Sequence, residues 1–164
     1  MRNMGSVLTL TQALEARDRL RIAGKTLVFT NGHFDLLHVG HLDYLEKART
    51  LGDALFVGVN GDASTEALKG SGRPIVPAAD RARLIAALRC VDAAILFETL
   101  TADDLISALK PEIYVKGGDY RDRDLPERPT VERCGGRVVL IDLLPERSTT
   151  ALIARIRALP EPHP

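Results

Sequence analysis

Two histidines separated by two residues are the most chemically informative feature of the chain. His38 and His41 follow the apolar segment Leu27–Phe29 and a short polar turn, and Gly40 lies between them. Residues three apart share one face of a helix, so both imidazoles are expected together at a helix N-terminus. Free backbone N–H groups and the helix dipole favour an anion there, and Gly40 leaves the backbone open to a phosphate chain. The pattern predicts a site for a triphosphate that is attacked at its α-phosphorus.

The same residues allow two other interpretations. One is a pair of surface histidines without a function. The other is a metal site formed by His33, Asp35, His38 and His41, because imidazole and carboxylate ligands at helical spacing bind zinc or iron. Gly40 and the preceding apolar strand suit close phosphate contact better, so we expect phosphate binding and no resident metal.

A second polar segment, 60–73, carries glycines, Asp62 and the two cations Lys69 and Arg73. Glycines and small polar residues predict flexible backbone. A long loop with two cations is suited to closing over phosphates and excluding water. An ordinary surface loop with solvated cations is the alternative.

Two more polar segments follow predicted strands. In 116–120, two adjacent glycines would let the backbone approach a flat base, and Asp119 would read the edge of that base or its ribose; a simple turn is the alternative. Ser148 is a natural helix N-cap. The hydroxyls of Thr149 and Thr150 next to free N–H groups would form a second anion site, since capping needs only one hydroxyl.

The elements that position these segments alternate along the chain. Strands are expected at 25–30, 54–60, 93–97, 113–116 and 137–141, and helices at 10–23, 38–51, 79–90, 102–109, 126–134 and 149–158. Such alternation predicts the α/β class: a Rossmann-like, five-stranded parallel sheet with helices on both faces. Each polar segment follows a strand, where ligands bind in such sheets, which predicts one shared site.

Length and composition limit which other classes of protein the chain can belong to. The 164 residues predict one domain over 1–159 and a disordered tail at 160–164. Lys plus Arg and Asp plus Glu both number 22, which argues against a nucleic-acid partner bound through a broad basic face. Cys90 and Cys134 share no metal-binding or disulfide spacing. The N-terminus lacks a signal-peptide core and no apolar run is long enough for a membrane span, so we expect a cytoplasmic protein without membrane contact.

The motifs also resemble those of a known family. The turn Asn31-Gly32-His33-Phe34-Asp35 and the run His38-Val39-Gly40-His41 are similar to the His-x-Gly-His motif of the nucleotidyltransferase superfamily. Lys116-Gly117-Gly118-Asp119-Tyr120 resembles, nearly letter for letter, a segment of the heptose 1-phosphate adenylyltransferase domains of bifunctional heptose synthases. The resemblance extends from about Leu10 to Arg157.

The resemblance implies an enzyme that transfers AMP from ATP to a heptose 1-phosphate, with D-glycero-β-D-manno-heptose 1-phosphate as the expected acceptor and Mg²⁺ on the triphosphate. It implies that His38, His41 and Lys69 are catalytic. The substrate-binding residues that it implies, some of them also indicated above, are Thr30, Asn31, Gly32, Phe34, Asp35, Gly40, Asp62, Arg81, Lys116, Gly117, Asp119, Ser148, Thr149 and Thr150. For Arg81 a solvated helix face is the alternative.

Two segments depart from the family pattern. Arg147 stands where relatives have an apolar residue or cysteine, and the charged segment 121–129 differs in spacing. The segment 121–129 leaves the exact sugar open. A cytidylyltransferase acting on glycerol 3-phosphate or a similar phosphoester shares the phosphate-binding features and is one alternative function, and a non-catalytic nucleotide-sensing module is another. The resemblance also implies a homodimer, and because a kinase domain does not fit into this length, a separate sugar kinase and phosphatase are expected as pathway partners.

Overall fold

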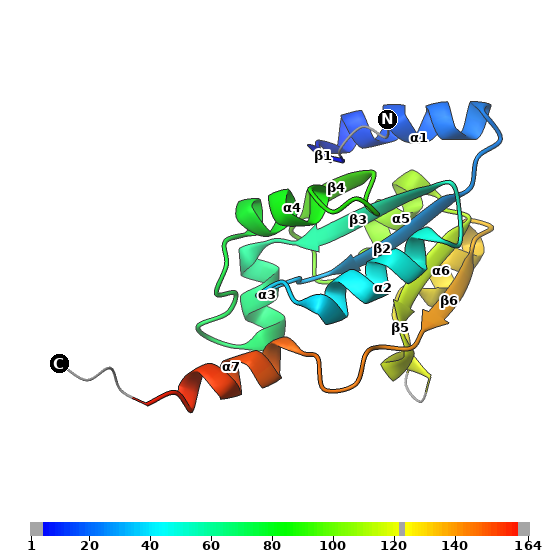
Figure 1. The fold of residues 1–164 in the computed structure, drawn as a ribbon. Coiled ribbons are helices and arrows are strands. Elements are labelled where there is room, and N and C mark those ends of the chain that lie inside the picture. The colour runs from blue at the N-terminus through cyan, green and yellow to red at the C-terminus, as the bar shows by residue number, and fades with distance from the viewer. Residues whose placement is uncertain (1–4, 122–123, 161–164) are drawn as a thin grey trace.

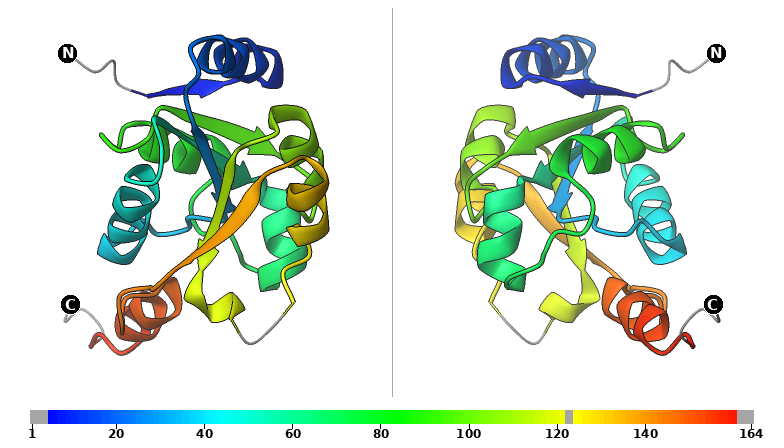
Figure 2. Two further views of the ribbon diagram at one scale, coloured as in Figure 1. Left: turned by 90° about the vertical axis from the view of Figure 1, so that its right-hand side faces the viewer. Right: turned by 90° about the vertical axis from the view of Figure 1, so that its left-hand side faces the viewer.

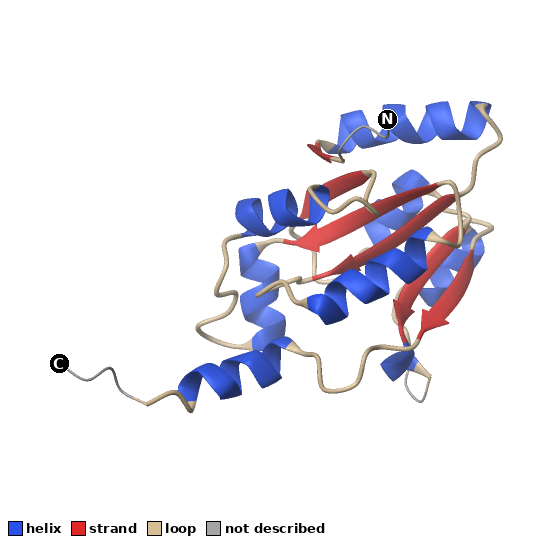
Figure 3. Cartoon of the chain, viewed as in Figure 1, coloured by secondary structure: helices blue, strands red, loops and turns tan. Residues whose placement is uncertain are grey.

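The computed structural model describes residues 5–121 and 124–160, and it is a parallel sheet wrapped by helices (Figures 1 and 3). The strands are β1 (Ser6–Leu8), β2 (Leu27–Gly32), β3 (Ala54–Asn60), β4 (Ala93–Phe97), β5 (Ile113–Gly117) and β6 (Arg137–Ile141). The α-helices are α1 (Leu10–Ile22), α2 (Val39–Arg49), α3 (Asp62–Lys69), α4 (Ala78–Ala86), α5 (Asp103–Leu109), α6 (Arg128–Arg133) and α7 (Thr149–Arg157), and a 3₁₀ turn, η1, covers Gly118–Tyr120.

The sheet has six strands in the order β1-β4-β3-β2-β5-β6, and every adjacent pair is parallel. The α/β class and all five predicted strands are confirmed, but the number five is wrong. The extra strand, β1, pairs with β4 at the sheet edge, where Ser6 lies opposite Ala93. Three residues with a largely exposed burial pattern carry too little periodicity to be recognised from sequence.

Helices cover both faces of the sheet (Figure 2). One apolar core lies under α2 and α4 and includes Leu45 and Ile85; the other lies under α5 and α6 and includes Ile106 and Val131. All seven residues of β3 are buried, as expected for a central strand covered on both faces. These two layers make the sheet a rigid support for the loops at its carboxyl edge.

Some local predictions are wrong. Residues 62–69 form α3, although we expected a loop, because the flanking Gly61 and Gly70 dominate the sequence pattern while the eight residues between them are helical. Helical spacing in 79–90 predicts that Leu84 faces inward beside Ile85, but Leu84 is exposed and only Ile85 is buried. The predicted tail 160–164 lies outside the described residues except for Pro160.

The order of the strands defines where a ligand fits. From β2 the chain continues to β3 and β4 on one side, and β5 and β6 lie on the other side. Such a reversal opens a crevice at the carboxyl ends of the central strands, here β2 and β5. No helix among the described residues has the length and apolarity needed to cross a membrane.

Candidate active site

The turn between β2 and α2 is held in one conformation from several sides. Phe34 and Leu36 adopt left-handed φ values of 50° and 51°, which non-glycine residues rarely do. Asp35, only 1% exposed, accepts hydrogen bonds from Arg73 Nε at 2.8 Å and from the backbone N–H groups of Ile75 and Val76 at 2.8 and 2.9 Å. Asp35 therefore fastens the segment 73–76 to the turn, and its carboxylate is fully used within the protein.

The charge of Asp35 follows from these contacts. Burial alone would raise the pKa of its carboxyl, but the backbone N–H groups of Ile75 and Val76 and the Arg73 guanidinium outweigh burial and lower the pKa below its usual range. Asp35 is thus ionised at neutral pH and Arg73 is its counterion. Arg73, which the sequence indicated as a phosphate-closing cation, pairs instead with Asp35.

The two histidines build the beginning of α2 themselves. His38 is the N-cap, and its Nδ1 accepts the Gly40 N–H at 3.1 Å, while His41 Nδ1 accepts the His38 N–H at 3.4 Å. The rings stack with centroids 3.8 Å apart and planes 25° apart. Because each Nδ1 is an acceptor, each neutral imidazole carries its proton on Nε2. The capping arrangement therefore presents two adjacent Nε2–H donors.

Both imidazoles are neutral in the ligand-free protein at neutral pH. Burial lowers the pKa of His38. Burial and the neighbouring His38 lower the pKa of His41 to about 4, against an opposing effect of Asp35. An anion placed against the pair would favour protonation of the rings, so the site is suited to phosphate oxygens that gain negative charge during a reaction.

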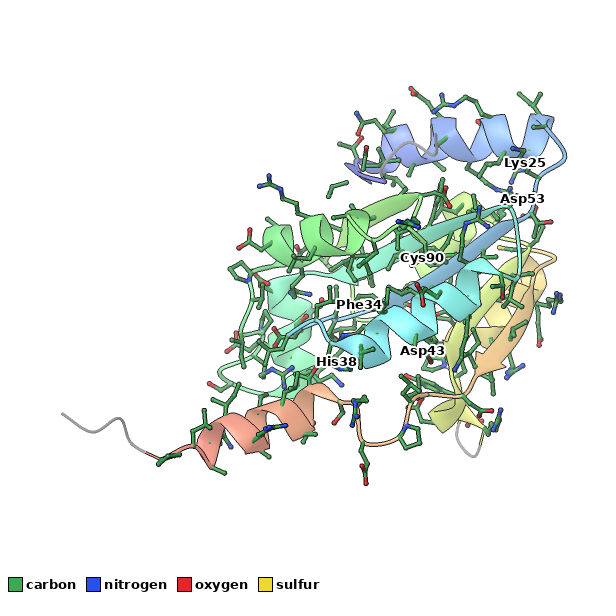
Figure 4. The ribbon with its side chains drawn as sticks, viewed as in Figure 1. Lys25, Phe34, His38, Asp43, Asp53 and Cys90 are labelled. Carbon is green, nitrogen blue, oxygen red and sulfur yellow. The ribbon has the colours of Figure 1, made fainter. Side chains whose placement is uncertain are left out.

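Gly40 and Phe34 fix where these rings lie. A Cβ at position 40 would lie 2.8 Å from His38 Cε1 and 2.9 Å from the Arg147 carbonyl oxygen. The glycine is thus needed to seat His38 and the 147 backbone, and the open phosphate path expected over it is filled by these groups. Phe34 is buried and meets His41 edge-on, with ring centroids 5.4 Å apart, and Figure 4 shows Phe34 and His38 near one another at the start of α2.

The ends of β2 and β5 form the floor of the crevice. Thr30 is fully buried and its hydroxyl donates to the Val115 carbonyl at 2.9 Å, so it joins the two strands. Asn31 Oδ1 accepts from the Tyr114 hydroxyl, and the Asn31 carbonyl accepts from Lys116 Nζ at 3.3 Å. The structure thereby brings Asn31 and Lys116 together.

Two glycines in this floor lie close against neighbouring side chains. A Cβ at Gly117 would lie 2.6 Å from Asp119 Oδ1, and one at Gly32 would lie 3.1 Å from the Phe34 ring. Asp119 is exposed in η1, immediately after β5. The segment 117–119 is thus a tight turn with an exposed carboxylate at the mouth of the crevice.

Arg81 is an internal connector of the site. It is 1% exposed, donates to the carbonyl oxygens of His33 and Val76, and forms an ion pair with Asp62 at 2.8 Å. Its solvated-face alternative is wrong. Asp62 and Arg81 neutralise each other, which indicates that both position the backbone around the site.

The sequence suggested His33 only as a ligand of the metal alternative and gave it no role in phosphate binding, yet the structure places it among cations. Its Nδ1 lies 3.0 Å from Thr65 Oγ1 on α3. Its pKa is lowered to about 4, chiefly by burial and then by the positive charges of Lys69, Arg81, Lys116 and Arg73. The available sequence signal was a histidine in a polar turn that directly follows a strand.

The N-terminus of α7 faces that of α2. Ser148 caps α7 by accepting the Ala151 N–H at 3.1 Å, and the Thr149 hydroxyl donates to the Asp35 carbonyl at 2.7 Å. Thr150 is an exposed residue. A cavity of about 350 Å³ lies between the helices, lined by His38, Glu146, Arg147, Ser148, Ala151, Leu152 and Arg155. One cavity thus adjoins a histidine, two helix N-termini and two guanidinium groups.

The metal alternative has no support in this arrangement. Across residues 5–121 and 124–160 no three His, Cys, Asp or Glu side chains are grouped as metal ligands. Asp35, one of the four residues considered, is directed to Arg73 and the 75–76 backbone. The site as built offers hydrogen-bond donors and cations, which are features of anion binding.

Comparison with known proteins identifies the family of this chain. The model of the cytidylyltransferase-like family matches residues 29–151, a range that runs from β2 to the first turn of α7 and includes His38, His41 and Ser148. The chain belongs to the cytidylyltransferase-like family. The resemblance to nucleotidyltransferases noted from the sequence is confirmed.

Two curated relatives, both named Bifunctional protein HldE, match most of this chain. The one from Syntrophotalea carbinolica is 51% identical over 90% of this chain and 30% of its own length, and the one from Pelobacter propionicus is 47% identical over 95% of this chain and 31% of its own length. The chain thus spans less than a third of these relatives.

Two solved structures share the fold. A lipopolysaccharide core biosynthesis protein from Thermoplasma volcanium is 30% identical, with a TM-score of 0.61 over 74% of this chain and 98% of its own. A pantoate–β-alanine ligase from Francisella tularensis, complexed with β,γ-ATP and β-alanine, also has a TM-score of 0.61, over 90% of this chain and 69% of its own, at 14% identity. The second likeness concerns the fold alone.

Proposed function

We propose that this domain transfers AMP from ATP to a heptose 1-phosphate, with D-glycero-β-D-manno-heptose 1-phosphate as the acceptor, and releases pyrophosphate. The observation that carries the proposal is the pair of stacked imidazoles with Nε2–H donors at the N-terminus of α2. The heptose acceptor is supported by the Lys116–Tyr120 segment, which resembles heptose adenylyltransferases, and by the high identity to the HldE relatives over nearly the whole chain.

In this proposal the reaction needs positioning and charge stabilisation rather than a protein nucleophile. A phosphate oxygen of the acceptor attacks the α-phosphorus of ATP, the bond from that phosphorus to the bridging oxygen breaks, and pyrophosphate leaves. His38 and His41 donate from Nε2 to oxygens on which negative charge grows. Their stacking and the buried Phe34 hold the donors in place before substrate arrives.

The remaining residues divide by location. We assign the pyrophosphate portion to the cavity between α2 and α7, where Ser148, Thr149 and Thr150 open the helix and Arg147 adds a cation. We assign the base and ribose to the floor at Asn31, Gly117 and Asp119. Mg²⁺ would enter with the triphosphate and neutralise its charge. The described part of the chain holds no group of three His, Cys, Asp or Glu side chains, which fits an ion held mainly by phosphate oxygens and water.

We also propose the setting of the reaction. A sugar kinase and a phosphatase would supply the acceptor, and the domain would act in the cytoplasm as a homodimer. Light scattering coupled to gel filtration tests the dimer, and an eluting mass near the 17.9 kDa of one chain would contradict it.

The deciding experiment is pyrophosphate release with Mg²⁺, in which ATP and CTP are crossed with β- and α-heptose 1-phosphate and glycerol 3-phosphate. Release with ATP and only one heptose phosphate is expected. Release with CTP and glycerol 3-phosphate would instead identify the cytidylyltransferase alternative. Nucleotide binding without release for any pair would identify a sensing module.

A further inference from the structure

A cluster of cationic side chains surrounds His33, and neither the pyrophosphate portion nor the base and ribose has been assigned to it. Three cations contact the short segment 31–35 directly: Lys116 donates to the Asn31 carbonyl, Arg81 to the His33 carbonyl and Arg73 to the Asp35 carboxylate. The His33 ring itself is hydrogen-bonded to Thr65 of α3, a fully buried residue. Cationic groups thus converge on His33 from α3, α4, β5 and the 70–76 segment.

Lys69 completes this group. Thr65 and Lys69 are four residues apart on α3 and so lie on the same face of that helix, which is the face that meets His33. Asp35 compensates Arg73 and Asp62 compensates Arg81. Lys69 is exposed and has no ion pair with any residue in 5–121 or 124–160. The cluster therefore retains positive charge that is not neutralised by its own acidic residues.

The position of His33 relative to the other histidines decides which phosphate it would receive. Figure 2 shows α3 and α2 on opposite faces of the sheet, with α7 on the side of α2. The cavity at His38 and α7 thus lies on one side of the 31–38 turn, and the His33 ring, against α3, lies on the other. In-line displacement at phosphorus requires the attacking and leaving oxygens on opposite sides.

We propose that His33, together with Lys69 and Lys116, binds the phosphate group of the acceptor on the α3 side of the turn, opposite the pyrophosphate site at α2 and α7. This assignment rests on the proposed nucleotidyl transfer and specifies where its second substrate binds. With Nδ1 held by Thr65, the His33 Nε2 is the atom that contacts a phosphate oxygen. Lys69 supplies the unpaired charge, and Lys116, fixed on the Asn31 carbonyl, supplies charge from β5.

The first test separates the two substrates kinetically. His33→Gln, which is polar and able to reach Thr65, and Lys69→Ala should each raise KM for the heptose 1-phosphate about tenfold, the effect of losing roughly one charge-assisted hydrogen bond. KM for ATP should change less than about twofold by the same reasoning. Lys25→Ala, at the far end of the molecule (Figure 4), controls for the loss of one positive charge. An unchanged acceptor KM, or an equal rise in KM for ATP, overturns the assignment.

The second test does not depend on turnover. The His33 imidazole resonance, identified by its absence in His33→Gln, should shift when inorganic phosphate is added to the wild-type protein, and the shift should be lost in Lys69→Ala but kept in Lys25→Ala. Phosphate-dependent shifts without any ADP-heptose formation would refute the proposed function and leave the anion site standing. ADP-heptose formation, with no phosphate-dependent shift of the His33 resonance and no change in the acceptor KM of the variants, would refute the inference and leave the function standing.

Discussion

The two helices that face each other across the candidate pyrophosphate site are anchored very differently. The turn into α2 is buried and bonded on all sides: Phe34 and Asp35 are 6% and 1% exposed, and Asp35 accepts three hydrogen bonds. α7 has no buried residue at all. Its N-terminus is tied to the turn through Thr149, while Ile156 is 56% exposed.

We call the turn before α2 together with the start of that helix the α2 wall of the site, and the start of α7 the α7 wall. The difference in how the two walls are anchored separates their roles. A preformed wall stabilises a transition state without reorganisation, and that wall is the one that carries the histidines. A weakly packed helix opens and closes at little free-energy cost, which suits the release of a charged product. We therefore expect mutations in the α2 turn to act on kcat and mutations at α7 to act on KM for ATP.

The strongest way to test this division is His41→Ala. The variant loses one of two preorganised donors, so kcat should fall by about 10²-fold or more while KM for ATP changes little. Steady-state kinetics over both substrates and direct ATP binding by calorimetry measure the two parts. Retained turnover with weakened ATP binding would place His41 in ground-state binding and remove the distinction between the walls.

Gly40→Ala should have the next largest effect. Its Cβ would lie 2.8 Å from the His38 ring and 2.9 Å from the Arg147 carbonyl, so both walls must shift. Overpacking of this kind costs about 1–3 kcal/mol of unfolding free energy, and displaced donors should lower kcat about tenfold or more. Urea unfolding and kinetics measure these effects. Gly24→Ala is the control: its added Cβ meets no atom within 4 Å, but its φ of 64° penalises a side chain, so it should lower stability without lowering kcat. Full activity in Gly40→Ala would show that the seat of His38 is adjustable.

A weaker perturbation addresses α7 alone. Thr149→Val removes the hydroxyl that donates to the Asp35 carbonyl, and a net hydrogen bond of about 0.5–1.5 kcal/mol corresponds to a rise in KM for ATP of roughly 2- to 12-fold. kcat should remain within about twofold, since the histidines stay in place. Thr149→Ser keeps the hydroxyl and should restore KM. A fall in kcat without a change in KM would mean that α7 belongs to the rigid wall.

The elements of the fold were easier to predict from the sequence than the contacts between side chains of the site. The parallel α/β class, five of the six strands and the Ser148 cap could be predicted, because alternating periodicity and capping residues are local signals. β1 could not, since three exposed residues acquire meaning only when paired with β4. The motif identified His38 and His41, but their mutual capping and neutral state depend on burial and on ring positions that spacing alone does not contain.

The roles of charged residues were the hardest to predict. Arg73 and Arg81 read as phosphate-facing or solvated cations, whereas both are engaged by carboxylates 38 and 19 residues away in sequence. His33 had no recognisable partner along the chain, because Thr65 is contributed by α3. Long-range pairing decides whether a charge is available to a ligand, and one sequence does not encode that pairing in any local pattern.

The last prediction concerns stability rather than catalysis and distinguishes the buried histidines from the exposed helix α7. His33 and His41 have pKa values of about 4 in the folded protein against an ordinary 6.5. Between these values the unfolded chain binds more protons, so the unfolding free energy should decrease as pH falls from about 6.5. Asp35 and Glu112, whose pKa values are lowered from 3.8 and 4.5, lose their contribution to the unfolding free energy only at lower pH, so denaturation between pH 7 and 5 reports mainly on histidine.

His33→Gln and His41→Gln should each flatten this pH dependence, whereas Arg155→Gln on α7 should leave it unchanged. An unchanged slope in both histidine variants would mean that neither ring is held neutral by the fold, and the neutral Nε2–H donors assigned to the α2 wall would have to be replaced by imidazolium groups.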